Sequence, residues 1–135
     1  MNYPISKSDQ EWLAQLGEEV YTIVRKKGTE RAFTGKYDRF YESGQYYCVC
    51  CQALLFSNNE KFSSGTGWPS FSNTPAPENI ETESDSSLGM VRTEIKCSQC
   101  GAHLGHLFND GPRPTKLRYC VNSAALIFKK QESKI

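Results

Sequence analysis

Two stretches, Cys48-Val49-Cys50-Cys51 and Cys97-Ser98-Gln99-Cys100, decide how this chain folds, because each sets two cysteines three positions apart. A C-x-x-C pair places two sulfurs on one tight turn, and two such turns supply the four thiolates of a tetrahedral zinc site. The predicted zinc ligands are therefore Cys48, Cys51, Cys97 and Cys100. With four sulfurs and no open position, this zinc would be structural and not catalytic. The alternative is four buried free thiols that hold no metal.

The long separation of the two pairs predicts more than a small zinc ribbon. The sequence between Cys51 and Cys97 is much longer than a ribbon loop, so it must form folded structure whose two ends the metal joins. Such a zinc contributes on the order of 10 kcal/mol to folding, which is comparable to the whole stability of a small domain. At 135 residues, the chain is long enough for one domain with a single core, and we expect one domain over residues 1–135.

Charge and hydropathy exclude several classes of protein. The 16 Lys and Arg residues against 15 Asp and Glu residues leave a net charge of +1, which gives no basic surface for nucleic acid or for an anionic membrane. No stretch is apolar for long enough to span a bilayer, and residues 1–7 contain no secretion signal. Cysteine pairs without such a signal favour a reducing cytoplasm and metal binding over a disulfide scaffold. We expect a cytoplasmic monomer with no nucleic-acid or membrane partner.

The N-terminal part, about residues 8–27, is predicted to be helical. Residues 8–11 read Ser-Asp-Gln-Glu, a capping box in which the serine accepts from the backbone and the glutamate reaches back. Apolar residues then recur at helical spacing, Gly17 breaks the run, and a second helix follows over residues 18–28. The β-branched content of residues 20–24 leaves a strand possible there.

From about residue 33 to residue 128, the pattern changes to short β-like runs broken by Gly, Pro, Asn and Ser. The strand candidates are residues 45–48, 53–57, 90–96 and 117–128. The segment 73–88 is rich in Pro, Ser and acidic residues, and we interpret its acidic side chains, Glu78, Glu81, Glu83 and Asp85, as solvated surface without a role. The predicted fold class is α+β, mostly β, with short N-terminal helices and mainly antiparallel sheet.

Cys120 is the cysteine that the two pairs leave over, since Cys50 lies inside the first pair and has no independent role that we can assign. Because side chains alternate along a strand, Arg118, Cys120 and Asn122 share one face, opposite an apolar row. A free thiol is only about 3% thiolate at pH 7, so nucleophilic chemistry requires a lowered pKa. Arg118 supplies positive charge near the sulfur, and Asn122 can donate a hydrogen bond. The alternative is a buried structural cysteine.

Both histidines of the chain follow the second cysteine pair closely. His103 and His106 can give or take a proton near neutral pH, and Asp110 is close enough in sequence to orient one of them. They could instead be metal ligands or surface residues, although the cysteines already complete a metal's ligand shell. In the glycine-flanked loop 65–71, Trp68 is either a core residue or an apolar wall for a small methyl-bearing group.

Three motifs occur in a specific order, namely residues 61–71 (KFSSGTGWPSF), 103–112 (HLGHLFNDGP) and 118–123 (RYCVNS). Together with both cysteine pairs, they resemble the B-type methionine sulfoxide reductases over about residues 28–128. The resemblance implies the β-tent (Mss4-like) fold of that family, in which a structural zinc joins two antiparallel sheets, with no organic cofactor. It also implies reduction of the R epimer of methionine sulfoxide, preferably within peptides and proteins.

The resemblance further implies a role for each motif residue. Cys120 would attack the sulfoxide sulfur as a thiolate and become a sulfenic acid. The residues that would bind and activate the sulfoxide are His103, His106, Asp110, Arg118 and Asn122, with His106, or a water that it holds, as first choice for protonating the oxygen. Trp68 would hold the methyl group, and Phe71 and Phe108 complete the expected substrate-binding set.

One position departs from the family pattern, because many members carry a resolving cysteine where this chain has Thr66. Since the first pair should hold Cys50 away from Cys120, we expect a one-cysteine cycle in which thioredoxin, or glutathione with glutaredoxin, reduces the sulfenic acid. Two other functions stay open from the residues alone. One is a thiol hydrolase that uses Cys120, His106 and Asn122, and the other is a non-enzymatic zinc module that binds other proteins.

Overall fold

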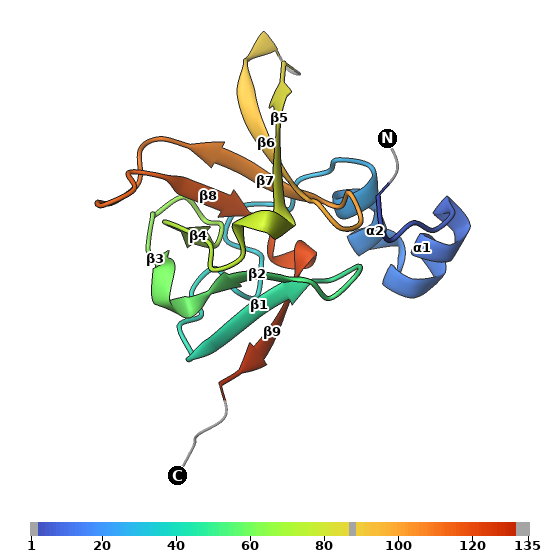
Figure 1. The fold of residues 1–135 in the computed structure, drawn as a ribbon, viewed down its shortest axis with the longest axis horizontal. Coiled ribbons are helices and arrows are strands. Elements are labelled where there is room, and N and C mark those ends of the chain that lie inside the picture. The colour runs from blue at the N-terminus through green and yellow to red at the C-terminus, as the bar shows by residue number, and fades with distance from the viewer. Residues whose placement is uncertain (1–2, 87–88, 132–135) are drawn as a thin grey trace.

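The computed structural model describes residues 3–86 and 89–131, and it begins with two short helices (Figure 1). Helix α1 (Asp9–Leu16) starts at the expected capping box: the Ser8 hydroxyl accepts from the Glu11 amide (3.2 Å), and the Glu11 carboxylate accepts from the Ser8 amide (3.0 Å). Gly17, at φ 84°, ends this helix, and α2 (Glu18–Arg25) follows at once. Both predicted helices are confirmed, and the strand alternative for residues 20–24 is wrong. No helix in the described ranges is long and apolar enough to cross a membrane.

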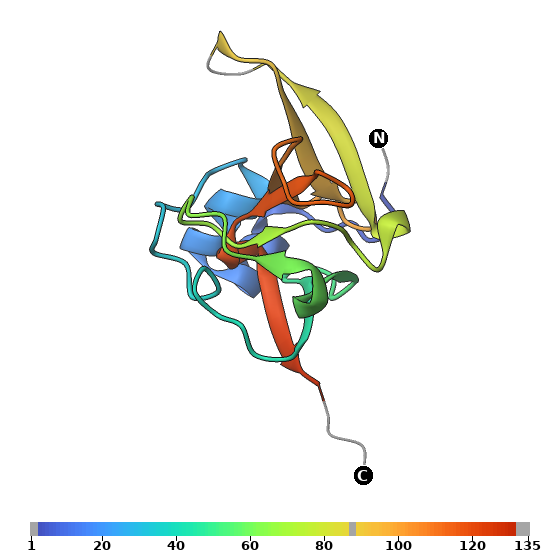
Figure 2. The ribbon, with the colours of Figure 1, turned by 90° about the vertical axis from the view of Figure 1, so that its left-hand side faces the viewer.

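Beyond the helices, the described residues form two antiparallel sheets, which Figures 1 and 2 show from two sides. The small sheet has the order β2-β1-β9 and comprises β1 (Gly44–Cys48), β2 (Leu54–Ser57) and β9 (Leu126–Lys130). The large sheet has the order β3-β4-β8-β7-β6-β5 and comprises β3 (Lys61–Phe62), β4 (Ser70–Phe71), β5 (Ile80–Asp85), β6 (Arg92–Cys97), β7 (His103–Phe108) and β8 (Arg118–Val121). All pairings among these strands are antiparallel, so the predicted fold class is confirmed.

The core lies where the two sheets meet. Phe56 of the small sheet stacks on Phe71 of the large sheet, with 4.4 Å between ring centroids, and Tyr46 meets Phe71 edge-on at 5.2 Å. All three rings are fully buried. Burying an aromatic side chain contributes roughly 1.5–3 kcal/mol, so this group is a large part of what holds the sheets together.

Residues 117–128, predicted as one strand, form two strands in different sheets. β8 ends at Val121, a 3-10 turn covers Ser123–Ala125, and β9 then pairs with β1. The chain therefore crosses from the large sheet to the small one directly after β8. This crossing leaves β8 between β4 and β7, with neighbours on both sides.

The acidic segment 73–88 is not simply solvated surface. Residues Ile80–Asp85 form β5, which pairs with β6 along its whole length in a hairpin that projects from the body (Figure 1). Only Ile80 is apolar in this strand, so no hydrophobic alternation marks it in the sequence. Asp85, interpreted above as surface, is 4% exposed, and that interpretation is wrong. Residues 87–88 of the segment lie outside the described residues.

Candidate functional site

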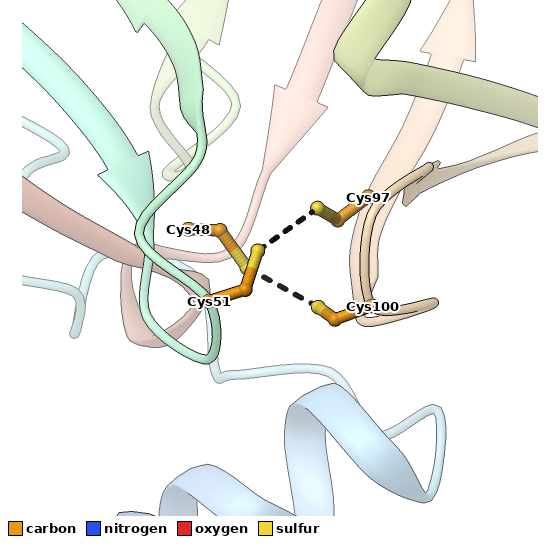
Figure 3. Close-up of side chains that lie close together, drawn as sticks. All are labelled: Cys48, Cys51, Cys97 and Cys100. Atoms are coloured by element: carbon orange, nitrogen blue, oxygen red, sulfur yellow. Dashed lines mark hydrogen bonds between the residues drawn. The ribbon is translucent and has the colours of Figure 1, made fainter. Parts of the chain in front are cut away.

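The four predicted metal ligands come together in one cluster (Figure 3). The Sγ atoms of Cys48 and Cys100 are 3.6 Å apart, and those of Cys51 and Cys97 are 3.5 Å apart. All four sulfurs lie within 4.8 Å of one another. A tetrahedral ion with bonds of about 2.3 Å would hold its sulfurs roughly 3.8 Å apart, so the cluster has the size and the donor set of a metal site.

The same local geometry builds both cysteine turns. The Gln52 amide donates to the Cys48 carbonyl oxygen (2.8 Å), and the Gly101 amide donates to the Cys97 carbonyl oxygen (2.7 Å). Gln52 (φ 65°) and Gly101 (φ 77°) both adopt the left-handed backbone, and glycine suits the second turn because a Cβ there would collide with the Tyr3 ring. Since Cys48 ends β1 and Cys97 ends β6, a metal bound here joins the small sheet to the large one.

Cys120 opens onto a pocket of about 190 Å³. Its lining combines six predicted site residues with five others: Trp68, His106, Phe108, Arg118, Cys120 and Asn122, together with Thr29, Thr66, Arg92, Gly105 and Val121. As expected from the alternation along a strand, Arg118, Cys120 and Asn122 reach this pocket together, while Tyr119 packs into the core.

Three predicted site residues do not line the pocket. His103 is 3% exposed, with its ring centroid 5.5 Å from that of His106. Phe71 is fully buried in the core and has no surface to offer a ligand. The Asp110 side chain is 62% exposed and reaches the pocket only through Arg118.

Cys120 of β8 lies directly opposite His106 of β7. Gly105 permits this close pairing, because a Cβ there would collide with the Cys120 carbonyl oxygen. Burial raises the pKa of the Cys120 thiol above its ordinary value, and the nearby Arg118 and Thr66 offset part of that rise. Arg118 acts in the direction that the sequence indicated, but burial outweighs it. The resting thiol is therefore protonated at neutral pH.

This balance between burial and positive charge predicts that the reactivity of the Cys120 thiol increases with pH. The rate of Cys120 alkylation by iodoacetamide should rise with pH, with a midpoint above that of an ordinary cysteine, because burial favours the protonated form. Arg118→Ala should move the midpoint further upward, since it removes the positive charge beside the sulfur, whereas Arg118→Lys should retain most of the effect. Mass spectrometry of the peptide containing residue 120 gives the rates. A midpoint in Arg118→Ala at or below that of the wild type would contradict this account.

Arg118 is fixed from two sides. The Asp110 carboxylate accepts hydrogen bonds from Nε (2.8 Å) and Nη2 (3.1 Å) of Arg118. The Arg118 guanidinium also lies 4.3 Å from the centre of the Phe108 ring. The same hydrogen bonds hold the pKa of Asp110 below its usual value. The expectation that Asp110 orients a histidine is not met, because its partner is Arg118.

Two buried carboxylates that the sequence did not reveal bind the histidines. Nε2 of His106 lies 2.8 Å from Oδ2 of Asp85, and Nδ1 of His103 lies 2.7 Å from Oε2 of Glu94. Lys27 reaches both acids, with its Nζ 3.2 Å from Glu94 and 3.7 Å from Asp85. Burial lowers the pKa of His106 by more than the hydrogen bond to Asp85 raises it. No local signal marks either acid, because Asp85 ends an acidic run and Glu94 stands among alternating charges.

The segment after α2 holds two further pocket residues through its backbone. The Glu30 carbonyl oxygen accepts from Nε1 of Trp68 (2.9 Å), and the Glu30 amide donates to Oδ1 of Asn122 (3.0 Å). The side-chain nitrogen of Asn122, Nδ2, donates to the Leu104 carbonyl oxygen (3.3 Å). Since that nitrogen carries two hydrogens, Asn122 keeps one donor for a ligand.

Comparison with known proteins agrees with these motifs. A family model described as SelR domain matches residues 16–130. A peptide methionine sulfoxide reductase MsrB of Leptospira interrogans is 54% identical over 131 residues, which cover 97% of this chain and 100% of that protein. Proteins of the same name from Synechococcus sp. and Hahella chejuensis are 55% and 57% identical, over 93% and 92% of this chain and 93% and 89% of their own lengths. The chain therefore belongs to the SelR domain family of B-type peptide methionine sulfoxide reductases.

Proposed function

We propose that this protein reduces the R epimer of methionine sulfoxide in peptides and proteins to methionine, and so repairs oxidised proteins. The proposal rests chiefly on one observation: the Cys120 thiol shares a small pocket with His106 and Trp68. A nucleophile, a proton carrier and an apolar wall are what thiol reduction of a methyl sulfoxide requires. Similarity to reductases along nearly the whole chain supports the same reaction.

In the proposed reaction, the Cys120 sulfur attacks the sulfoxide sulfur while His106, or a water that it holds, protonates the oxygen. Methionine leaves as a thioether, and Cys120 retains the oxygen as a sulfenic acid. Cys120 loses two electrons and the substrate gains them. The proton lost by the Cys120 thiol is the one that the sulfenic acid carries, so this step consumes no other reactant.

We assign substrate binding to the rest of the pocket lining. Trp68 and Phe108 would contact the methyl group and the methylene next to the sulfur, since they supply the aromatic surface of the pocket. Arg118 and Asn122 would donate to the developing negative charge on the oxygen. Asp110 would support this role by fixing Arg118, and His103 would support His106 from behind the pocket.

We propose that an external thiol returns Cys120 to its reduced form. Cys50 is 6% exposed and lies within the first cysteine turn, where it is poorly placed to attack a sulfenic acid at residue 120. Thioredoxin, or glutathione with glutaredoxin, would supply the electrons, which suits a reducing cytoplasm. We also propose that the protein acts as a monomer.

Thr66→Cys should convert this cycle into one with an internal resolving thiol. Thr66 lines the same pocket as Cys120 and interacts with its sulfur, so a thiol at position 66 would attack the sulfenic acid at a high effective concentration. We expect thioredoxin-coupled turnover to rise several-fold, roughly the gain of an intramolecular thiol at millimolar effective concentration. The rate of the sulfoxide step itself should not change.

The matched control for this variant is Thr66→Ser, which keeps the hydroxyl and adds no thiol. Thioredoxin-coupled NADPH oxidation and single-turnover methionine formation measure the two rates separately. If sulfoxide reduction slows in Thr66→Cys but not in Thr66→Ser, the Thr66 hydroxyl has a role in the chemical step.

We propose zinc as the metal of the cysteine cluster. Four thiolates in two tight turns are the donor set that zinc prefers in structural sites, and the spacing of the sulfurs fits a tetrahedral ion. Such an ion would brace the two sheets and would lie outside the reaction, because the pocket lining contains none of its ligands.

One assay distinguishes reduction from the two other functions that the residues left open. A peptide containing methionine-R-sulfoxide is incubated with the wild-type protein and dithiothreitol. Release of the reduced peptide supports the proposal, cleavage of the peptide indicates a thiol hydrolase, and binding without reaction indicates a binding module. The S epimer should remain unreacted. Consumption of both epimers at equal rates would contradict the assignment to the R form.

A further inference from the structure

His106 contacts Asp85 through one ring nitrogen, and its other ring nitrogen has no hydrogen-bond partner among residues 3–86 and 89–131. Its Nε2 lies 2.8 Å from Oδ2 of Asp85, whose side chain is 3% exposed. Lys27 and Arg92 each place a side-chain nitrogen 3.7 Å from this carboxylate, and two nearby cations favour its ionised form. An ionised carboxylate can only accept a hydrogen bond. The hydrogen between the two groups therefore belongs to Nε2.

The free nitrogen of His106 is consequently Nδ1. Burial holds the pKa of His106 below its usual value, so at neutral pH the ring is uncharged and Nδ1 carries a lone pair. Cys120 is the direct cross-strand partner of His106, and both side chains line the pocket. Opposed residues have Cβ atoms about 5 Å apart, a separation that lets a ring nitrogen and a thiol interact directly or through one water. A proton acceptor and a protonated thiol thus line the same pocket from adjacent strands.

We propose that Asp85 is a positioning residue that holds His106 in the Nε2–H form, so that Nδ1 takes the Cys120 proton and passes it to the sulfoxide oxygen. The inference rests on the proposed function and names the route of its proton. The S–H bond of Cys120 breaks as its sulfur attacks, and Nδ1 receives the proton. The imidazolium, stabilised by Asp85, then gives that proton to the sulfoxide oxygen. The substrate S–O bond breaks and the oxygen bonds to the Cys120 sulfur as the sulfenic acid hydroxyl. The bond between the two sulfurs breaks as methionine leaves as the thioether. Atoms and electrons balance without another donor.

The second histidine provides an internal comparison, because its bonding is reversed. Glu94 binds His103 through Nδ1, at 2.7 Å, and the same Lys27 contacts Glu94. His103 is 3% exposed and does not line the pocket. The hydrogen bonds of Glu94 to His103 and Lys27 outweigh the effect of burial and hold its pKa below the usual value, so this carboxylate also accepts the ring proton. His103 should therefore carry a proton on Nδ1.

The first test needs no variant. The chain contains only these two histidines, so ¹⁵N-labelled protein gives two imidazole spin systems. Titration with the reduced methionine peptide assigns them, because His106 lines the pocket and His103 does not. Long-range ¹H–¹⁵N correlation identifies the protonated nitrogen of each ring. We expect Nε2–H for His106 and Nδ1–H for His103. If His106 is found as Nδ1–H in the folded wild-type protein, the inference fails, whatever the activity.

The second test compares two variants of equal burial. Asp85→Asn should abolish the preference of His106 for Nε2–H and slow single-turnover sulfenic acid formation by roughly 100-fold, the lower range for a lost acid–base function. KM for the peptide should be unchanged, because Asp85 does not line the pocket. Glu94→Gln is the matched control, because it also removes a buried carboxylate that contacts Lys27. It should change the proton position on His103 while slowing the reaction far less.

The outcomes separate the two levels of the argument. A wild-type protein that does not reduce the sulfoxide sinks the proposed function itself. An active wild type with equal slowing in Asp85→Asn and Glu94→Gln, at equal thermal stability, would reduce Asp85 to a structural residue and overturn the inference. An Asp85→Asn protein that keeps both its rate and the Nε2–H form would do the same.

Discussion

Replacing Cys120 by serine is expected to abolish sulfoxide reduction, lowering the single-turnover rate by at least about 1,000-fold, or roughly 4 kcal/mol of transition-state stabilisation. A serine hydroxyl is a far weaker nucleophile than a thiolate. Its oxygen also cannot accept the sulfoxide oxygen, whereas the cysteine sulfur does so when it becomes a sulfenic acid. The change therefore removes both the attacking group and the oxygen acceptor. The measurement is methionine formed from an R-sulfoxide peptide, with excess dithiothreitol, by wild type and variant.

The variant should stay folded, because Cys120 takes no part in the metal cluster. Its metal content and circular dichroism should match the wild type. Cys50→Ala is the matched control, since it removes the other cysteine outside the predicted ligand set, and with dithiothreitol it should turn over like the wild type. An active Cys120→Ser protein would identify another nucleophile. A Cys50–Cys120 disulfide trapped after one turnover would refute the one-cysteine cycle.

Loss of the metal is expected to unfold the protein. Cys48 and Cys97 are fully buried at the ends of strands from different sheets, so an ion bound by them would link the sheets directly. A structural zinc contributes on the order of 10 kcal/mol, and a domain has only about 5–15 kcal/mol in total. Cys97→Ser should therefore eliminate the cooperative urea transition, and a strong chelator should shift the wild-type transition to much lower urea. Elemental analysis should find one zinc per folded wild-type chain.

Ser98→Ala supplies the control for this experiment. Ser98 lies in the same turn as Cys97, is not a ligand, and donates a hydrogen bond to the Glu78 carbonyl oxygen (2.6 Å). Its replacement should cost only about 1 kcal/mol and leave the metal bound. A Cys97→Ser protein with an unchanged urea midpoint, or a wild type that a chelator does not destabilise, would show that the cluster is four free thiols.

The features that the sequence predicted correctly depend on neighbours close in the chain. The capping box of Ser8 and Glu11 spans one helical turn, each cysteine pair spans one tight turn, and Arg118, Cys120 and Asn122 follow from the two-residue repeat of a strand. In each case a few consecutive residues contain the whole geometry. The resemblance to the family adds the proposed role of Cys120 as nucleophile, whereas the spacing alone leaves a nucleophile and a buried structural thiol equally open.

The features that the sequence did not predict depend on strand register. Asp85 reaches His106 across β6, and Glu94 stands opposite His106 although its side chain binds His103. A shift of one residue in this pairing would turn both acids to the other face of the sheet, and nothing local specifies the register. Phe71 was misjudged for a related reason, because its partner Phe56 belongs to the other sheet.

The place of β9 has a consequence for how this protein is made. β1 lies in the middle of the small sheet, and its residues Gly44–Cys48 pair with Leu126–Lys130 near the end of the chain. During translation, both cysteine turns are synthesised before β9, and therefore before the small sheet can be completed. Until β9 has been synthesised, one edge of β1 has no partner strand in the small sheet and is exposed to pairing with other chains.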